Sequence, residues 1–112
     1  AVKMQGQKMF IKKDCKIDEQ GLTDAVVALK LLANDRRLAI LCLIGDGEMS
    51  VTEIGDYVDL SQSALSQHLA LFRKSGIVET RKHGQVVYYA LKDEKIKATI
   101  AKLYQLYCQN EK

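Results

Sequence analysis

One amphipathic stretch, residues 60–76, constrains the fold of this chain more than any other segment. Ser61 is a good helix N-cap, and Gly76 is a good C-terminal stop. Apolar residues between them recur at i, i+4 and i+7, which predicts a helix that buries one face. That face consists of Leu65, Leu69 and Phe72. The opposite face carries Gln62, Ser63, Ser66 and Gln67 in its first two turns, and Arg73 and Lys74 in its last turn.

The polar face of this helix indicates a function. Amide and hydroxyl side chains near a helix N-terminus can pair with base edges in a DNA major groove, and flanking cations suit phosphates. We therefore interpret the stretch as a recognition helix, with Ser61 near the DNA backbone. An ordinary solvated helix face is the alternative, and the stretch alone does not decide between the two.

A shorter helix is predicted directly before it. Residues 50–53 read Ser-Val-Thr-Glu, which is the pattern of a capping box. Val51, Ile54 and Val58 then fall on an inward face. Only a short turn separates this helix from Ser61. Two helices joined in this way, the second with polar side chains at its start, form a helix-turn-helix.

After Gly76 the hydrophobic period changes. Residues 77–82 and 85–91 are rich in β-branched and aromatic side chains, and His83-Gly84 between them suits a tight turn. This pattern predicts a β-hairpin of the wing type. Its tip carries Arg81, Lys82 and His83, which could reach a minor groove or phosphates. A solvated hairpin tip without a partner is the alternative.

Three further helices complete a mainly α-helical fold, a winged helix-turn-helix with five helices and a two-stranded wing. They are predicted at about residues 20–33, 35–44 and 94–109, the last two with N-caps Asn34 and Asp93. Residues 38–44 of the second of these helices are apolar all round, which indicates a central, buried helix. The last helix has an apolar stripe that needs a partner, and a two-fold dimer through the first and last helices would cover it. Such a homodimer would place its recognition helices about 34–36 Å apart, on palindromic double-stranded DNA.

Charge is distributed unevenly over the 112 residues, although the net charge is only +3. Residues 61–92 hold five Lys or Arg and one Glu, whereas residues 17–60 hold nine acids and three bases. Positive charge therefore collects around the proposed recognition helix, which favours a polyanionic partner. We expect a flexible arm at 1–16 and one domain at 17–112. With no apolar run long enough to span a membrane and no signal peptide pattern, we expect a cytoplasmic protein without membrane contact.

Two segments are similar to a known family. Residues 32–41 and 60–71 resemble the ArsR/SmtB family of winged-helix repressors, and the likeness extends over about residues 22–109. Metal-sensing members carry a Cys-x-Cys at the start of the third helix, or Asp and His ligands on the last helix. Here Ser50 and Thr52 occupy the first site, and the last helix has no His. We therefore expect no metal and no cofactor.

The cysteines resemble a different branch of that family. Cys42 and Cys108 match the dithiol of its thiol-based members, the BigR/SqrR-type persulfide sensors and the related HlyU regulators. The resemblance implies that a persulfide, a polysulfide or another oxidant bridges the two cysteines and releases DNA. A general oxidant sensor, and an activator that displaces a silencing protein, remain alternatives. So do two idle thiols, since free cysteines are often only buried apolar residues.

Two other classes of protein are weaker alternatives. A thiol oxidoreductase would need a Cys-x-x-Cys, a partnered nucleophile and base, or a cofactor loop, and the sequence contains none of these. We therefore expect no enzyme activity and no catalytic residue. A winged helix that binds only protein would leave the basic surface without a purpose. Cys15 has no counterpart to which a role can be assigned.

Overall fold

A computed structural model describes residues 16–108, which fall into two units that meet at Ala33 and Asn34. The first unit contains one helix, α1 (Glu19–Leu32), one residue earlier at each end than predicted. Asp18 caps it by accepting a hydrogen bond from the backbone N–H of Gly21 at 2.7 Å. Its apolar side chains are largely exposed, and Leu29 for example retains 58% of its accessible surface. Except for Lys16, the predicted arm lies outside the described residues.

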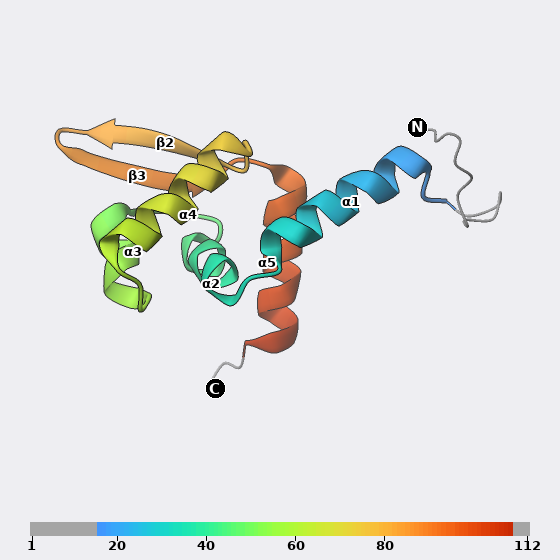
Figure 1. Ribbon diagram of the computed structural model, residues 1–112, viewed down its shortest axis with the longest axis horizontal. Helices are drawn as coiled ribbons and strands as arrows, with labels where there is room; N and C mark the ends of the chain where they lie inside the picture. Colours follow the sequence, from blue (N-terminus) through green and yellow to red (C-terminus); the bar gives the residue numbers. More distant parts are fainter. Residues whose placement is uncertain (1–15, 109–112) are drawn as a thin grey trace. The chain divides into compact units, whose positions relative to one another are not determined.

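The second unit contains four helices and a three-stranded antiparallel sheet with the strand order β1-β3-β2. Figure 1 shows α2 at the centre of this unit, with the sheet on one side and α5 on the other. Its elements are α2 (Asp35–Ile44), β1 (Glu48–Ser50), α3 (Val51–Tyr57), α4 (Gln62–Lys74), β2 (Val78–His83), β3 (Val86–Leu91) and α5 (Glu94–Tyr107). The sequence predicts the five helices of the described chain. It also predicts the helix-turn-helix, formed by α3 and α4, and the wing that follows, formed by β2 and β3.

The predicted two-stranded wing is confirmed as β2 and β3, and β1 adds a third strand to the sheet on the other edge of β3. Its residues pair with β3 in the register Glu48↔Ala90, Met49↔Tyr89 and Ser50↔Tyr88. Three residues are too few to show a period of two, so pairing with a distant strand, rather than a local pattern, creates β1. The turn also lies one residue later than predicted. His83 pairs with Val86, which leaves Gly84, at a φ of 64°, and Gln85 in the turn.

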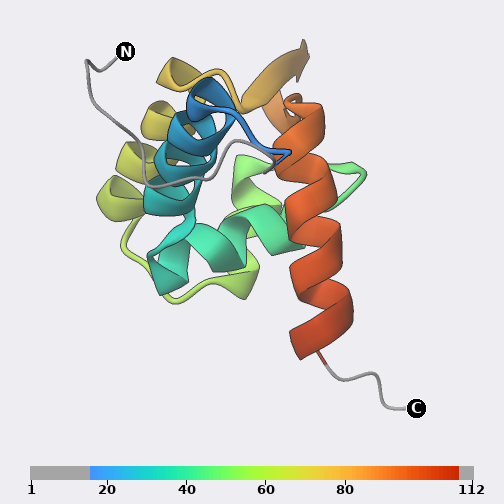
Figure 2. The ribbon, with the colours of Figure 1, turned by 90° about the vertical axis from the view of Figure 1, so that its right-hand side faces the viewer.

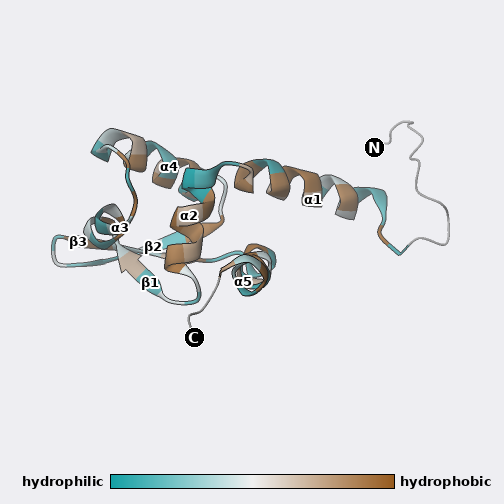
Figure 3. Cartoon of the chain, turned by 90° about the horizontal axis from the view of Figure 1, so that it is seen from below, coloured by the Kyte–Doolittle hydropathy of each residue, from teal (hydrophilic) through white to brown (hydrophobic). Residues whose placement is uncertain are grey.

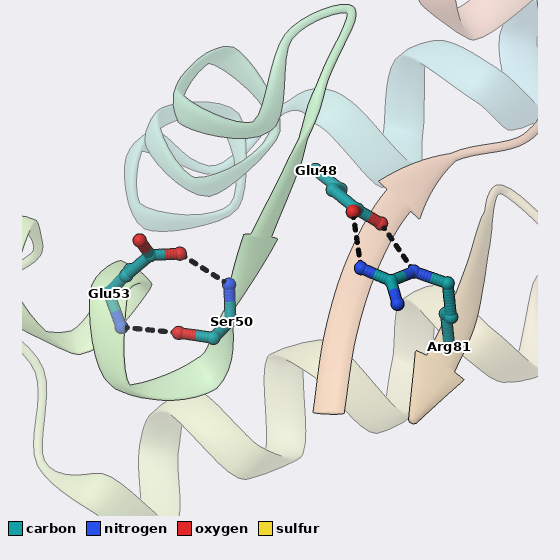
Figure 4. A network of polar contacts seen from close by, with 4 residues as sticks. All are labelled: Glu48, Ser50, Glu53 and Arg81. Atoms are coloured by element: carbon teal, nitrogen blue, oxygen red, sulfur yellow. Dashed lines mark hydrogen bonds and ion pairs between the residues drawn. The ribbon is translucent and has the colours of Figure 1, made fainter. Parts of the chain in front are cut away.

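Each helix of the second unit begins at the N-cap that the sequence predicts. Asn34, Ser50, Ser61 and Asp93 all accept a hydrogen bond from a backbone N–H two or three residues later. The capping box is complete. The Ser50 Oγ accepts from the Glu53 N–H at 3.1 Å, and the Glu53 Oε1 accepts from the Ser50 N–H at 2.9 Å (Figure 4). These local bonds set where α3 and α4 start.

The core forms around α2, which is apolar from residue 38 to its end, and Figure 3 shows most of this helix in the colour of hydrophobic residues. The largest fully buried side chains come from α2, α3 and α4: Ile40, Leu41, Ile54 and Phe72. The expectation that α2 is buried on all sides is wrong for one side, because Ala39 is exposed and Cys42 is only half-buried. An all-round apolar pattern does not say which side a short helix turns to the core.

Helix α5 contacts α2 and β3, and its fully buried side chains lie in its first half. Ile96 and Ile100 of the predicted stripe are buried, whereas Tyr107 retains 77% of its accessible surface. In Figure 2 the C-terminal turns of α5 extend beyond the other elements of the unit. The second half of α5 therefore leaves apolar side chains exposed, among them Tyr104 and Leu106. None of the helices in residues 16–108 has the length and apolar character needed to cross a membrane.

The capping box provides a test of how α3 is held. Replacing Ser50 by Ala removes the cap and leaves the Glu53 N–H without its partner, so we expect the free energy of unfolding to fall by about 1–2 kcal/mol. Urea denaturation at one fixed protein concentration measures this change. Thr52→Ala on the exposed side of the same helix is the control, with an expected change below about 0.5 kcal/mol. Equal losses for the two variants would contradict a specific role of the cap.

Candidate nucleic-acid interface and thiol pair

Helix α4 has a buried face and an exposed polar face, as its sequence predicts. Leu65, Leu69 and Phe72 are buried and anchor it in the unit. The predicted base-contacting side chains are all exposed and lie within the first two turns: Gln62, Ser63, Ser66 and Gln67. The structure therefore places these four on one exposed helical surface, where amides and hydroxyls can form hydrogen bonds with a ligand.

The two ends of α4 differ in charge. At its start, the Ser61 Oγ accepts from the Ala64 N–H at 3.1 Å and lies 3.4 Å from the Ser63 Oγ. This hydroxyl therefore caps the helix. At its end, Arg73 and Lys74 are exposed. A helix rises about 1.5 Å per residue, which separates these cations from Gln62 by roughly 17 Å along the axis. They belong to the opposite end of the candidate surface from Ser61.

The wing presents its predicted cations in two different ways. Lys82 and His83 are exposed at the end of β2, beside the turn. Arg81, in contrast, is engaged within the sheet. Its Nε donates to the Glu48 Oε1 at 3.2 Å and its Nη2 to the Glu48 Oε2 at 2.6 Å (Figure 4). The guanidinium also lies over the ring of Tyr88, 4.7 Å from the ring centroid.

The ion pair shifts the titration of both of its members. The hydrogen bonds from Arg81 are the largest cause that holds the pKa of Glu48 below the ordinary value of a glutamate. Desolvation acts in the opposite direction, and the charge of Arg81 is a smaller cause that lowers the pKa. The same bonds raise the pKa of Arg81. Because the pKa of Glu48 is lowered in the folded state, the pair stabilises the fold above the ordinary glutamate pKa and loses this effect as pH falls through the lowered value. At neutral pH it is fully charged.

Sequence reasoning missed Glu48 and Tyr88, the two partners of Arg81. Glu48 lies 33 residues before Arg81, and the two come together only because β3 pairs with both β1 and β2. A local pattern does not contain this information. The contact depends on the register of β1 against β3, and the sequence did not predict β1.

The two cysteines of the candidate switch lie on helices that pack together. Cys42 is half-buried on α2, and Cys108 is the exposed C-cap residue of α5. Both thiols are free. Burial raises the pKa of the Cys42 thiol, and the nearby charge of Cys108 raises it further. Cys15 lies outside the described residues.

Cys42 lines a cavity of about 890 Å³ between α2, the end of α3 and α5. Its walls are mostly apolar, with Leu43, Val58 and Ile100 among them, and Lys97 and Asp46 supply two charges. The half-buried thiol therefore has open space beside it. Among the residues that the structure describes, no group of three or more His, Cys, Asp or Glu side chains is placed to hold a metal ion.

Comparisons with known proteins agree with this architecture. A sequence model of the bacterial regulatory protein, arsR family, matches residues 34–80, which contain α2 to α4 and the start of β2. The transcriptional activator HlyU of Vibrio cholerae serotype O1 is 53% identical over 91 residues, which cover 81% of this chain and 84% of HlyU. The biofilm growth-associated repressor of Agrobacterium fabrum is 37% identical over 93 residues, which cover 83% and 80%.

A solved structure shares the fold as well as the sequence. The structure of reduced HlyU from Vibrio cholerae N16961 superposes with a TM-score of 0.77 at 53% sequence identity, covering 81% of this chain and 96% of that one. These relatives are DNA-binding transcriptional regulators and not enzymes. The chain therefore belongs to the ArsR family of winged-helix transcriptional regulators.

Proposed function

We propose that this protein is a homodimeric, thiol-switched regulator that binds palindromic operator DNA while Cys42 and Cys108 are reduced. Persulfides or polysulfides bridge the two cysteines, and the bridged form leaves the operator. The observation that carries this proposal is the placement of one half-buried and one exposed thiol on α2 and at the end of α5, two helices that pack together. The membership of the chain in a family of DNA-binding regulators supports the DNA part of the proposal.

The proposed DNA surface combines α4 with the wing. Gln62, Ser63, Ser66 and Gln67 face the bases, since exposed amides and hydroxyls at a helix start match base edges in the major groove. The proposed backbone contacts are made by Ser61, Arg73, Lys74, Arg81, Lys82 and His83. Because Arg81 is hydrogen-bonded to Glu48, it is the cation of this set that is least available to contact a phosphate. Phosphate contacts of this kind position the helix, and base contacts give specificity.

A two-fold dimer fits the apolar surface that the described chain leaves exposed. Regulators of this family are typically dimers. Val26 and Val27 on α1 and Leu106 and Tyr107 on α5 retain between 42% and 77% of their accessible surface. Burial of such side chains against a second copy is favourable by about 25 cal/mol per Å². A dimer would carry two α4 helices, and a palindromic operator would match its symmetry.

The bridge forms in steps that balance. The exposed Cys108 thiol takes the outer sulfur of an organic persulfide R–S–SH, which releases R–SH and leaves a persulfide, –S–SH, on Cys108. Cys42 then loses its proton and attacks the inner sulfur of that group, so a disulfide forms between Cys42 and Cys108, and HS⁻ leaves and takes up the proton. If a second persulfide first converts Cys42 to its own persulfide, the same condensation gives a trisulfide and hydrogen sulfide.

The bridge acts through the packing of α5. It closes a loop of 65 residues between Cys42 and Cys108 and ties the end of α5 to α2. In the chain-entropy model such a loop corresponds to up to about 4 kcal/mol. The bridge shifts the equilibrium between the DNA-binding and released conformations only if its free energy differs between the two. A difference of a few kcal/mol is sufficient. Because α5 carries the proposed dimer surface, its movement changes the spacing of the two α4 helices.

A second candidate function is activation through displacement of a silencing protein. The 53% identical relative is named a transcriptional activator, whereas the 37% identical relative is named a repressor. Both modes use the same DNA surface, so the geometry does not separate them. Deletion of the protein separates them: reporter output from its target promoter rises if the protein represses and falls if it activates.

Gln67→Ala tests the role of α4 in base recognition. The loss of two hydrogen-bonding groups to a base is worth about 1–3 kcal/mol, so we expect affinity for the operator to fall by about fivefold to a hundredfold. Affinity for a mixed-sequence duplex should change little. Fluorescence anisotropy measures both, with an operator selected from random duplexes by the unaltered protein. Gln105→Ala on the exposed surface of α5 is the control. Equal losses on both duplexes would remove Gln67 from the base-contacting set.

Intact-mass spectrometry tests the bridge. A Cys15→Ser variant keeps only Cys42 and Cys108, and after treatment with an organic persulfide we expect a product that lacks two hydrogens, with or without one added sulfur. Peptide mapping should locate the link between Cys42 and Cys108, and operator affinity should fall by about tenfold or more. Cys42→Ser and Cys108→Ser in the same background are the controls and should keep their DNA affinity. A bridged protein that binds the operator as before would contradict the switch.

The reactivity of Cys42 should follow its raised pKa. In the Cys15→Ser background, its alkylation by iodoacetamide, followed by peptide mapping, should reach half its maximal rate above the ordinary pKa of a thiol. Adding Cys108→Ser removes the smaller of the two causes, so the profile should move to lower pH but stay above the ordinary value. A raised pKa also means that Cys42 stabilises the fold below the ordinary thiol pKa and loses this effect as pH rises through the raised value. A half-maximal rate below the ordinary thiol pKa would contradict this account.

A further inference from the structure

The ion pair between Glu48 and Arg81 crosses the sheet of the wing. Glu48 lies on β1 and Arg81 on β2, and β3 runs between them. Arg81 pairs with Tyr88 of β3, and Glu48 pairs with Ala90, two residues further along the same strand. Residues i and i+2 of a strand share a face, so all four lie on one side of the sheet. The guanidinium therefore extends inward across β3 and stacks on Tyr88, instead of projecting from the edge.

The geometry of this pair is that of an arginine bound to an anion. Two nitrogens of Arg81 donate to the two oxygens of one carboxylate, at 3.2 and 2.6 Å. A DNA phosphate offers the same arrangement of two oxygens to a guanidinium. Both side chains are about half exposed, 53% for Arg81 and 41% for Glu48, so a pair of this kind contributes little to the stability of the fold. It remains accessible to a competing anion.

We propose that Glu48 competes with DNA phosphate for Arg81 and thereby limits the affinity of the wing for non-specific DNA. This inference depends on the proposed binding of DNA by α4 and the wing. While Glu48 holds Arg81, Lys82 is the main fixed cation near the wing tip, and Arg81 reaches a phosphate only when Glu48 releases it. Non-specific binding depends almost entirely on cations that displace counterions from phosphates. The pairing of Arg81 with Glu48 therefore weakens non-specific binding more than operator binding, because operator binding also includes base contacts.

Glu79 is a matched control within the same sheet. It is exposed on β2, two residues before Arg81, and it pairs with Ala90 as Glu48 does on the other side. The structure gives it no hydrogen bond or ion pair with Arg81 in the part of the chain that it describes. Glu79→Gln therefore makes the same change in net charge on the same face without freeing Arg81.

The test compares Glu48→Gln, Glu48→Ala and Glu79→Gln in the full chain with reduced cysteines. Each is titrated by fluorescence anisotropy against a mixed-sequence duplex over a range of salt concentrations. We expect both Glu48 variants to bind several-fold more tightly than Glu79→Gln. We also expect the slope of log affinity against log salt to become steeper by about 0.9, the value for one additional phosphate contact. In an Arg81→Gln background, Glu48→Gln should have no more effect than Glu79→Gln.

Each other outcome contradicts the proposal. Equal gains for Glu48→Gln and Glu79→Gln would mean that only net charge matters. Weaker binding by the Glu48 variants, with unchanged thermal unfolding, would mean that the pair holds the wing in the shape that binds DNA. Failure of the unaltered protein to bind either this duplex or a selected operator would overturn the proposed function itself. If instead the unaltered protein binds DNA and the Glu48 variants bind as Glu79→Gln does, only the role of Glu48 is contradicted.

Discussion

Strand β3 is the element on which the rest of the second unit depends, because its backbone is paired on both edges. β1 occupies one edge and β2 the other, and α2, α3 and α5 all contact β3. One face of β3 sends Tyr89 and Leu91 into the core. Its other face carries Tyr88, over which the Arg81 guanidinium lies. A strand with backbone partners on both sides holds its neighbours in a fixed register, so β3 joins the wing to the helical core.

Helix α4 keeps its polar face exposed because its apolar face is buried in the unit. Its buried stripe, with Phe72 fully enclosed, packs the helix against the unit, and turning the polar face away would expose these apolar side chains. The capping box at Ser50 and the cap at Ser61 define where α3 and α4 begin. Side chains that read DNA need a support of this kind, because a recognition surface is useful only if its hydrogen-bonding groups keep their relative positions.

The thiol pair and the DNA surface occupy different parts of the same unit. Cys42 lies on α2, whose other side forms the core, and Cys108 lies at the end of α5, beyond the buried half of that helix. The exposed Cys108 thiol is accessible to a reagent, whereas Cys42 is half-buried and burial raises its pKa, which disfavours its thiolate. This difference gives the proposed reaction an order, with Cys108 first and Cys42 second. It also connects the chemistry to α5, the helix proposed to form the dimer.

The sequence by itself determined the helices, the N-caps of the four helices in the second unit and the two faces of α4. These features depend on interactions between residues a few positions apart, such as Asn34 with Arg37, Ser61 with Ala64 and Asp93 with Ile96. The periodic burial of Leu65, Leu69 and Phe72 is local in the same sense. For this reason the helix-turn-helix and its candidate base-contacting residues could be placed from the order of the residues alone. The pairing of Cys42 with Cys108 came from resemblance to a family, not from a local pattern.

Only the tertiary structure decided which distant residues meet. Strand β1 exists because β3 pairs with it, and the bond between Glu48 and Arg81 joins residues 33 positions apart. The tertiary structure also decided that one side of α2 leaves Cys42 beside a cavity, and that α5 buries only its first half. The physical reason is that a period identifies the apolar side of an element but not the element that covers it. Contacts between distant segments are specified by packing and strand register, which belong to the whole fold.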